Sequence, residues 1–210
     1  MALTTYTAGE VLTAASLNDN LAYAVTVPAA VPGGLVAVVP TSVAVGSGSG
    51  SVSATGTVTF TGASSVSVNG CFTATYTNYL VLINWFTAVS ADPTLRWRVS
   101  GADNSTASSY VCSVANAGAT SWGVQTDTAS SATFSYSSGS ASTAKTETSL
   151  TIYEPFLAVQ TRHNQNNAGT LSYGQQQIVG KHNQSTSYDG FSILSSSNLT
   201  GTLTVYGYAL

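Results

Sequence analysis

The chain has 210 residues, 43% of them hydrophobic, which suffices for a core of ordinary domain size and excludes general disorder. Only 6% of the residues are Asp, Glu, Lys or Arg, against about 25% in typical soluble domains. With five basic residues and a net charge of −3, the sequence lacks the clustered Lys and Arg that nucleic acids or anionic membrane surfaces attract. We therefore expect no nucleic-acid partner.

The polar surface of so uncharged a chain must come from Ser, Thr, Asn, Gln and Gly. Strands and turns accommodate these residues, whereas surface helices usually depend on Glu and Lys. Composition therefore favours a mostly β protein.

Membrane, export and disulfide signals are weak in this sequence. The most apolar run, residues 79–89, is interrupted by Asn84 and is too short to span a bilayer, so no membrane insertion is expected. The N-terminus has neither the basic nor the apolar region of a secretory signal. Cys71 and Cys112 are too few for a disulfide framework, and we favour reduced thiols over a single bridge between them.

Helical periodicity is confined to the N-terminal segment, residues 1–26. After Thr13, a residue type that caps helix N-termini, apolar residues recur at spacings of three and four: Ala14, Leu17, Leu21 and Ala24. So short a helix is marginal alone and needs a partner. We predict a helical attachment and oligomerisation segment that makes its contacts through Val11, Leu12, Leu17 and Leu21.

Residues 27–62 change character. Three prolines punctuate a Val- and Ala-rich stretch, and Gly and Ser then alternate over residues 46–51. A loop between strands and an extended arm both fit this composition. We favour an arm or linker that separates the anchor from a head domain at 63–210.

From about residue 56 the hydrophobic period becomes two, which is typical of strands. Residues 80–85 are apolar on both faces and predict a central strand, while residues 95–99 predict one buried face and one wet face bearing Arg96 and Arg98. Between eight and ten short strands are separated by Gly-, Ser- and Asn-containing turns, including Ser100-Gly101 and Thr200-Gly201. The pattern predicts an antiparallel β-sandwich, either jelly-roll-like or Greek-key.

Catalytic and metal-binding constellations are not evident. His163 and His182 lie in similar His-Asn-Gln contexts, which we interpret as exposed loops, without metal-ligand spacing around them. The eight acidic residues are scattered, and no Gly-x-Ser-x-Gly elbow joins a strand to a helix. We predict that the protein is not an enzyme and uses no cofactor or metal.

Aromatic residues provide the better binding hypothesis. We interpret Trp85 and Trp97 as core residues and Trp122 as loop-borne. Tyr and Trp at a surface can stack on sugars or fill protein hot spots, and nearby Asn and Gln can bind hydroxyls. The candidate receptor or interface contacts are Trp122, Tyr173, Tyr188, Tyr206 and Tyr208.

Two stretches resemble known viral proteins. The opening segment from Tyr6 to Leu21, with Gly-Glu-Val-Leu-Thr-Ala followed by Leu-Asn, resembles the attachment segment of phage tail-fibre and minor structural proteins. The strand Leu95-Arg-Trp-Arg-Val-Ser-Gly101 and the closing Val-Tyr-Gly strand resemble the β-rich C-terminal domain of structural proteins from tailed phages. The resemblance implies a virion location and oligomerisation, and it brings no catalytic residues.

These observations together predict a bacteriophage virion structural protein on a surface appendage. The leading interpretation is a homotrimeric tail fibre or minor tail protein whose partners are itself, other virion proteins and a host cell-surface glycan. A capsid decoration or head-fibre protein and a carbohydrate-binding receptor-recognition module remain as alternatives.

Overall fold

The computed structural model describes residues 33–117, 122–135, 145–169 and 174–209; side chains are described for all of these except 122–128. The chain divides into two compact units. The first, Met1–Gly34 with Ala209–Leu210, lies almost wholly outside the described residues. The predicted helix and its contact residues Val11, Leu12, Leu17 and Leu21 fall there. The second unit, Leu35–Tyr208, contains nearly all of the described residues.

The described part of the chain is a single antiparallel sheet without a helix, as the composition predicts. Its strands, in chain order, are β1 (Gly34–Val38), β2 (Ser42–Val45), β3 (Ser49–Val52), β4 (Thr57–Asn69), β5 (Asn78–Thr87), β6 (Thr94–Val99), β7 (Ala102–Asp103), β8 (Tyr110–Ala117), β9 (Trp122–Ala129), β10 (Ala132–Thr133), β11 (Thr146–Tyr153), β12 (Gln160–Ala168), β13 (Gln175–Ser185) and β14 (Gly190–Ala209). The main path of hydrogen-bonded neighbours is β10-β6-β14-β5-β11-β12-β13-β8-β9.

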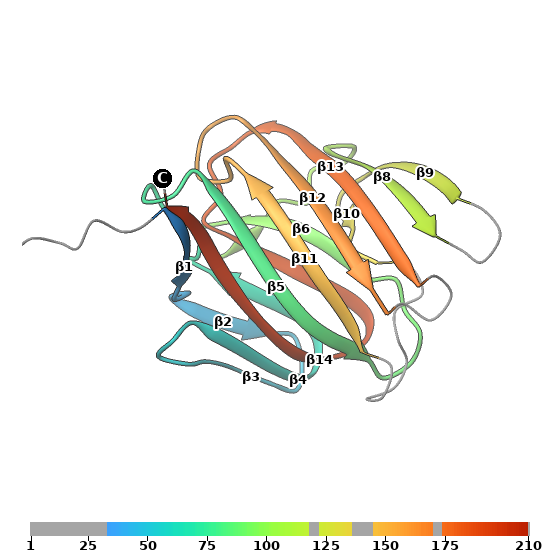
Figure 1. Cartoon of the computed structure of the whole chain (residues 1–210), viewed down its shortest axis with the longest axis horizontal. Coiled ribbons are helices and arrows are strands. Elements are labelled where there is room, and N and C mark those ends of the chain that lie inside the picture. Colours follow the sequence, from blue (N-terminus) through green and yellow to red (C-terminus); the bar gives the residue numbers. More distant parts are fainter. Residues whose placement is uncertain (1–32, 118–121, 136–144, 170–173, 210) are drawn as a thin grey trace, which may run out of the picture. The chain divides into compact units, whose positions relative to one another are not determined.

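Two long strands, β4 and β14, bend the sheet over on itself. The first part of β14, Gly190–Leu194, pairs with β6, whereas its second part, from Leu199 to Gly207, pairs with β5, and β4 follows β14 along both parts. The register of β14 against β4 shifts at Leu199 and Gly201, so the predicted turn at Thr200-Gly201 is instead an irregularity inside one strand. Figure 1 shows the resulting layers, with β5, β11, β12 and β13 in front of β6 and β10.

Aromatic side chains from the two layers meet in the core. Trp97 of β6 packs on the ring of His163 of β12 at 5.7 Å, and Trp85 of β5 packs on Phe134 at 5.5 Å. Both tryptophans are buried, which confirms the sequence prediction. β5 is central, between β14 and β11, also as predicted.

The segment predicted as an extended arm is part of the sheet from residue 34 onward. β2 and β3 both pair with β4, one on each side of Gly62. Between them Ser47 reaches into the bend of β4, where its Oγ donates to the Gly62 carbonyl at 2.9 Å and accepts from the Ser64 amide at 2.9 Å. Gly48 has a positive φ of 70° and leaves no room for a Cβ beside Thr61, so the Gly-Ser composition serves a tight corner and not a linker.

Turn chemistry is well predicted at the β6–β7 hairpin. Val99 pairs with Ala102 across the two residues Ser100 and Gly101, whose φ angles are 52° and 79°. Two successive positive φ values are the signature of a type I′ turn, whose second position favours glycine.

The predicted wet face of β6 needs a correction. Arg98 is buried and forms an ion pair with Asp103, while its guanidinium also donates to Ser67 and Ser192 at 3.0 and 2.8 Å. The alternation of residues along β6 predicts that Arg98 is exposed to solvent. Hydroxyl groups of β4 and β14 instead form a polar pocket in which this cation is buried.

Candidate functional site

The outward-facing side of the front layer, formed by β14, β5, β11, β12 and β13, is a broad polar surface. Alternation along β14, β5, β11, β12 and β13 turns every second side chain away from the core, and the registers align these side chains in rows across the strands. The first row contains Thr202, Asn84 and Glu147, and the second contains Thr204, Leu82, Ser149, Asn166 and Gln177. We call this surface the outer face.

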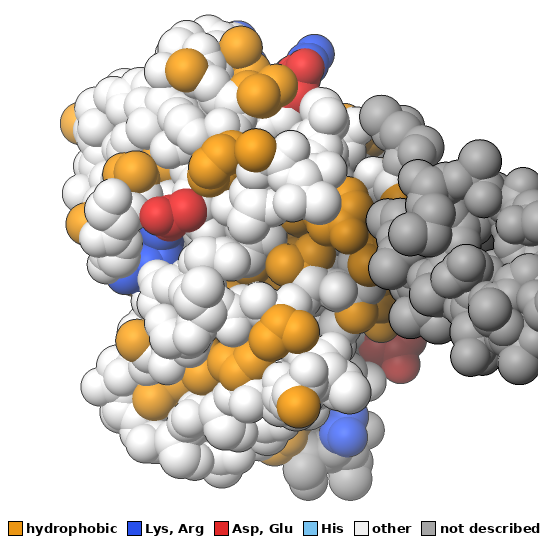
Figure 2. All heavy atoms as spheres, turned by 90° about the vertical axis from the view of Figure 1, so that its left-hand side faces the viewer, with side chains coloured by type: hydrophobic (Ala, Val, Ile, Leu, Met, Phe, Trp, Pro, Cys, Tyr) orange, Lys and Arg blue, Asp and Glu red, His pale blue; other side chains and the backbone are white. Residues whose placement is uncertain are grey.

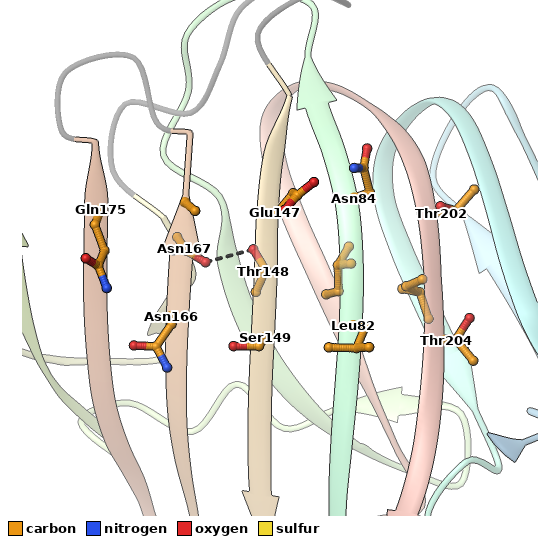
Figure 3. Close-up of a pocket in the computed structure, with 13 residues that line it drawn as sticks. Leu82, Asn84, Glu147, Thr148, Ser149, Asn166, Asn167, Gln175, Thr202 and Thr204 are labelled. Carbon is orange, nitrogen blue, oxygen red and sulfur yellow. Dashed lines mark hydrogen bonds between the residues drawn. The ribbon is translucent and has the colours of Figure 1, made fainter. Parts of the chain in front are cut away.

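A hollow of about 510 Å³ lies over these rows (Figure 3). Its sides are outward-pointing amides and hydroxyls, and Gln175 of β13 borders it. Leu82, which is 43% exposed, places an apolar patch among them. Glu147 is the one carboxylate among the residues that line the hollow. We call it the neutral hollow.

The chemistry of the neutral hollow is hydrogen bonding without strong charge. Amide and hydroxyl groups both donate and accept, as a ligand rich in hydroxyls requires. A glycosidase needs two carboxylates flanking the bond that it cleaves, and Glu147 has no second acid beside it in this hollow. The lining of the neutral hollow therefore offers hydrogen-bonding groups but not the carboxylate pair of a glycosidase.

A buried hydrogen-bond network stiffens the sheet beneath the neutral hollow. Asn167 accepts from the Thr148 hydroxyl at 2.7 Å and from the Gln165 amide at 2.8 Å, and it donates to the Phe134 carbonyl at 2.9 Å. Trp85 donates in turn to Thr148 at 3.0 Å. Gln165 and Asn167 are buried, so only the alternate, outward-facing side chains of the amide-rich β12 can supply polar groups to the rim of the neutral hollow.

Both histidines are buried in strands, which corrects their interpretation as exposed loop residues. His182 donates from Nε2 to the Ser109 hydroxyl, because that hydroxyl already donates to the Thr106 carbonyl, and Nδ1 accepts from Tyr188. His163 has no hydrogen-bond partner on either ring nitrogen among the described residues. Burial lowers the pKa of each to about 4, so both are neutral at pH 7.

The candidate contact residues divide between core and surface. Tyr188 is fully buried and bonded to His182 and Asn104, so it cannot contact a receptor, and burial raises its pKa. Tyr206 and Tyr208 are partly exposed. Trp122 is the first residue of β9 and not part of a loop, while Tyr173 lies outside the described residues.

The cysteines and Asp189 are explained by the fold and form no reactive site among the described residues. Cys71 and Cys112 are buried free thiols, and burial raises the pKa of Cys71 well above its usual range. Asp189 accepts from the Ser100 amide at 2.9 Å and so supports the β6–β7 turn. Among the described residues, no three of His, Cys, Asp and Glu gather as a metal would need.

Figure 2 shows one face of the molecule, on which charged groups are few. Polar and backbone atoms dominate this face, hydrophobic side chains form short bands, and acidic and basic groups lie next to each other in places. Within the described ranges no helix has the length and hydrophobicity needed to cross a bilayer.

Comparison with known proteins gives no family for this chain. No family model and no curated protein matches it. Among solved structures it is similar to a functionally unknown protein from Saccharomyces cerevisiae, with 8% sequence identity and a TM-score of 0.27 over 76% of this chain and 95% of that one.

Proposed function

We propose that this chain is a non-enzymatic structural component of a tailed bacteriophage, a trimeric tail fibre or minor tail protein. Residues 1–26 attach it to the particle and to its sister chains, and the β-rich region is displayed for contact with the host. The bent sheet acts as a sandwich-like head, in which β4 and β14 run through both layers.

The outer face with its neutral hollow is the observation that carries this proposal. The neutral hollow presents Asn, Gln, Ser and Thr from five neighbouring strands and a single charged group, the carboxylate of Glu147. Such a surface costs less to desolvate than a charged one, because neutral groups need only hydrogen-bond partners and no counter-charge. It suits a stable contact with another surface. The resemblance of the opening segment to phage attachment segments supports the location.

Labelling of intact particles tests the location. An antibody raised against residues 63–210 should decorate the tail or its fibres in electron micrographs. Label on the head would replace the tail assignment by the decoration-protein alternative, and particles without label would refute the virion assignment.

Light scattering tests the oligomer. The purified full chain should have three times the mass of one chain, and a monomer at micromolar concentration would contradict the trimer. The chain without residues 1–26 serves as the control, because it should lose the trimer if that segment holds it together.

Carbohydrate recognition is a second candidate function that the neutral hollow favours, because hydroxyl-rich ligands match its amides and hydroxyls. Binding of the purified chain to a glycan array would support it. Asn166→Ala should weaken that binding, and Asn183→Ala, at an exposed position outside the neutral hollow, should not.

A further inference from the structure

A second hollow, of about 560 Å³, lies on the same outer face. Asn164 lines it, two residues before Asn166 of the neutral hollow on β12, a step of roughly 7 Å. Its rim includes Tyr153, Arg162, Asn164, Lys181, Ser113 and Val179. We call it the basic hollow.

Two of the five basic residues of the chain stand side by side in the basic hollow. Arg162 of β12 and Lys181 of β13 are direct cross-strand partners. Like charges placed opposite each other destabilise a sheet, so their pairing in so uncharged a chain calls for an anion nearby. Glu154 meets part of that need with a 3.0 Å ion pair to Arg162, but the pair is exposed and weak.

Positive charge remains unmatched after that pair is counted. Among the side chains that the structure describes, no carboxylate forms an ion pair with Lys181. The Arg162 side chain is 63% exposed, so the guanidinium N–H groups not used by Glu154 face solvent. The hollow therefore attracts an anion, in contrast to the neutral hollow, where Glu147 repels one.

An aromatic ring completes the basic hollow. Tyr153 is the cross-strand partner of Arg162 and is 38% exposed. An exposed tyrosine ring offers an apolar face and a polar tip, which suits a sugar ring with hydroxyls at its edge. Asn164 adds an amide within the same hollow.

We propose that the basic hollow binds an acidic sugar unit, a saccharide that carries a carboxylate. Arg162 and Lys181 bind the carboxylate, Tyr153 packs on the ring, and the next neutral unit extends into the neutral hollow. This inference rests on the proposed host-contacting function, since it names the chemistry of the contact. It also predicts the orientation of the ligand, whose acidic unit lies at Lys181 and whose neutral end lies toward Glu147.

Calorimetric titration with a matched pair of oligosaccharides tests the inference. The full-length chain is titrated, at low ionic strength, with an oligosaccharide that has one uronic acid unit followed by neutral units. It is also titrated with the methyl ester of the same oligosaccharide. We expect at least about tenfold tighter binding of the acid form, because charge-assisted hydrogen bonds are roughly twice as strong as neutral ones. Added salt should weaken this preference.

Charge-matched variants distinguish binding in the basic hollow from a general effect of the protein's charge. Lys181→Gln should lose most of the preference for the acid form, and Lys181→Arg should retain it. Lys145→Gln removes the same charge from an exposed position outside the basic hollow and should change the preference less than about twofold. Circular dichroism confirms the fold of each variant.

Several outcomes would overturn the inference. Equal affinity for ester and acid, equal losses in Lys181→Gln and Lys145→Gln, or displacement of the saccharide by inorganic phosphate alone would each do so. Equal binding of polyglutamate would assign the hollow to an acidic protein. None of these results touches the particle labelling, so a failure here is distinguishable from a failure of the proposed function.

Discussion

Acidification below pH ~6.5 should destabilise this protein steeply, because two histidines are buried in the neutral form. Burial lowers the pKa of His163 and His182 to about 4 in the folded protein, whereas an imidazole in an unfolded chain titrates near ~6.5. Between these values the unfolded state binds more protons than the folded state, so the free energy of unfolding rises with pH. The stability is fully present above pH ~6.5 and is lost as the pH falls toward 4.

The magnitude can be worked out from the two shifts. Each histidine loses about 1.5 kcal/mol of stability between pH ~6.5 and ~5, so the pair loses about 3 kcal/mol, a large fraction of a typical 5–15 kcal/mol. Urea unfolding followed by tryptophan fluorescence at several pH values in this window measures it, because Trp97 packs on His163.

His163→Leu is the discriminating variant. It removes one titrating group and two unpartnered polar atoms, so it should keep or raise the stability at pH 7 and halve the slope against pH. A slope that the substitution leaves unchanged, or a wild-type stability that is flat across the window, would refute the assignment of buried neutral histidines.

Three further predictions concern packing, charge and thiol chemistry. A Cβ on Gly180 would lie 2.4 Å from the His163 ring, so Gly180→Ala should lower the free energy of unfolding by about 1–3 kcal/mol. His163→Ala in the same chain should recover part of this loss. If urea unfolding shows that the two substitutions have strictly additive effects, the contact is contradicted. Arg98→Met leaves Asp103 without its cation and should cost about 2–4 kcal/mol, and a urea midpoint close to the wild-type value would count against that pair. Cys71 should react with a disulfide reagent only after unfolding, since burial disfavours its thiolate, and rapid labelling of the native chain would be inconsistent with the core.

Periodicity and turn chemistry predict the local structure because they are local properties. Residues 80–85 form a central strand, and Ser100-Gly101 forms a two-residue hairpin turn, where the physical requirement lies in the residues themselves. The full length of β14 is not predictable in this way, because Gly201, which ordinarily indicates a turn, here sits where a Cβ would strike the backbone of Asn84.

The features that the sequence does not predict, the buried polar residues and the cross-strand neighbours, depend on partners far away in the chain. Arg98 is buried because serine and asparagine groups of β4 and β14 accept hydrogen bonds from its guanidinium. His182 is buried because hydroxyl groups of Ser109, directly before β8, and Tyr188, between β13 and β14, bind its two ring nitrogens. The outer face could be expected as polar alternation, but Arg162 and Lys181 become neighbours only through the register of β12 with β13. That register depends on the whole sheet, which no window of sequence contains.

Because charged residues are so few in this chain, the position of each one is informative. Charged surface groups repel like-charged partners and hold water, and a chain with 6% charged residues and a net charge of −3 presents few of them. Neutral amides and hydroxyls also exchange water for a partner at lower cost than ionised groups do. A protein built for lasting contact gains from both effects, and it can keep charges for structure or recognition. Arg98 serves structure, in its pair with Asp103 beneath the surface. In our proposal, Lys181 serves recognition, since it is exposed and has no ion-pair partner among the described residues.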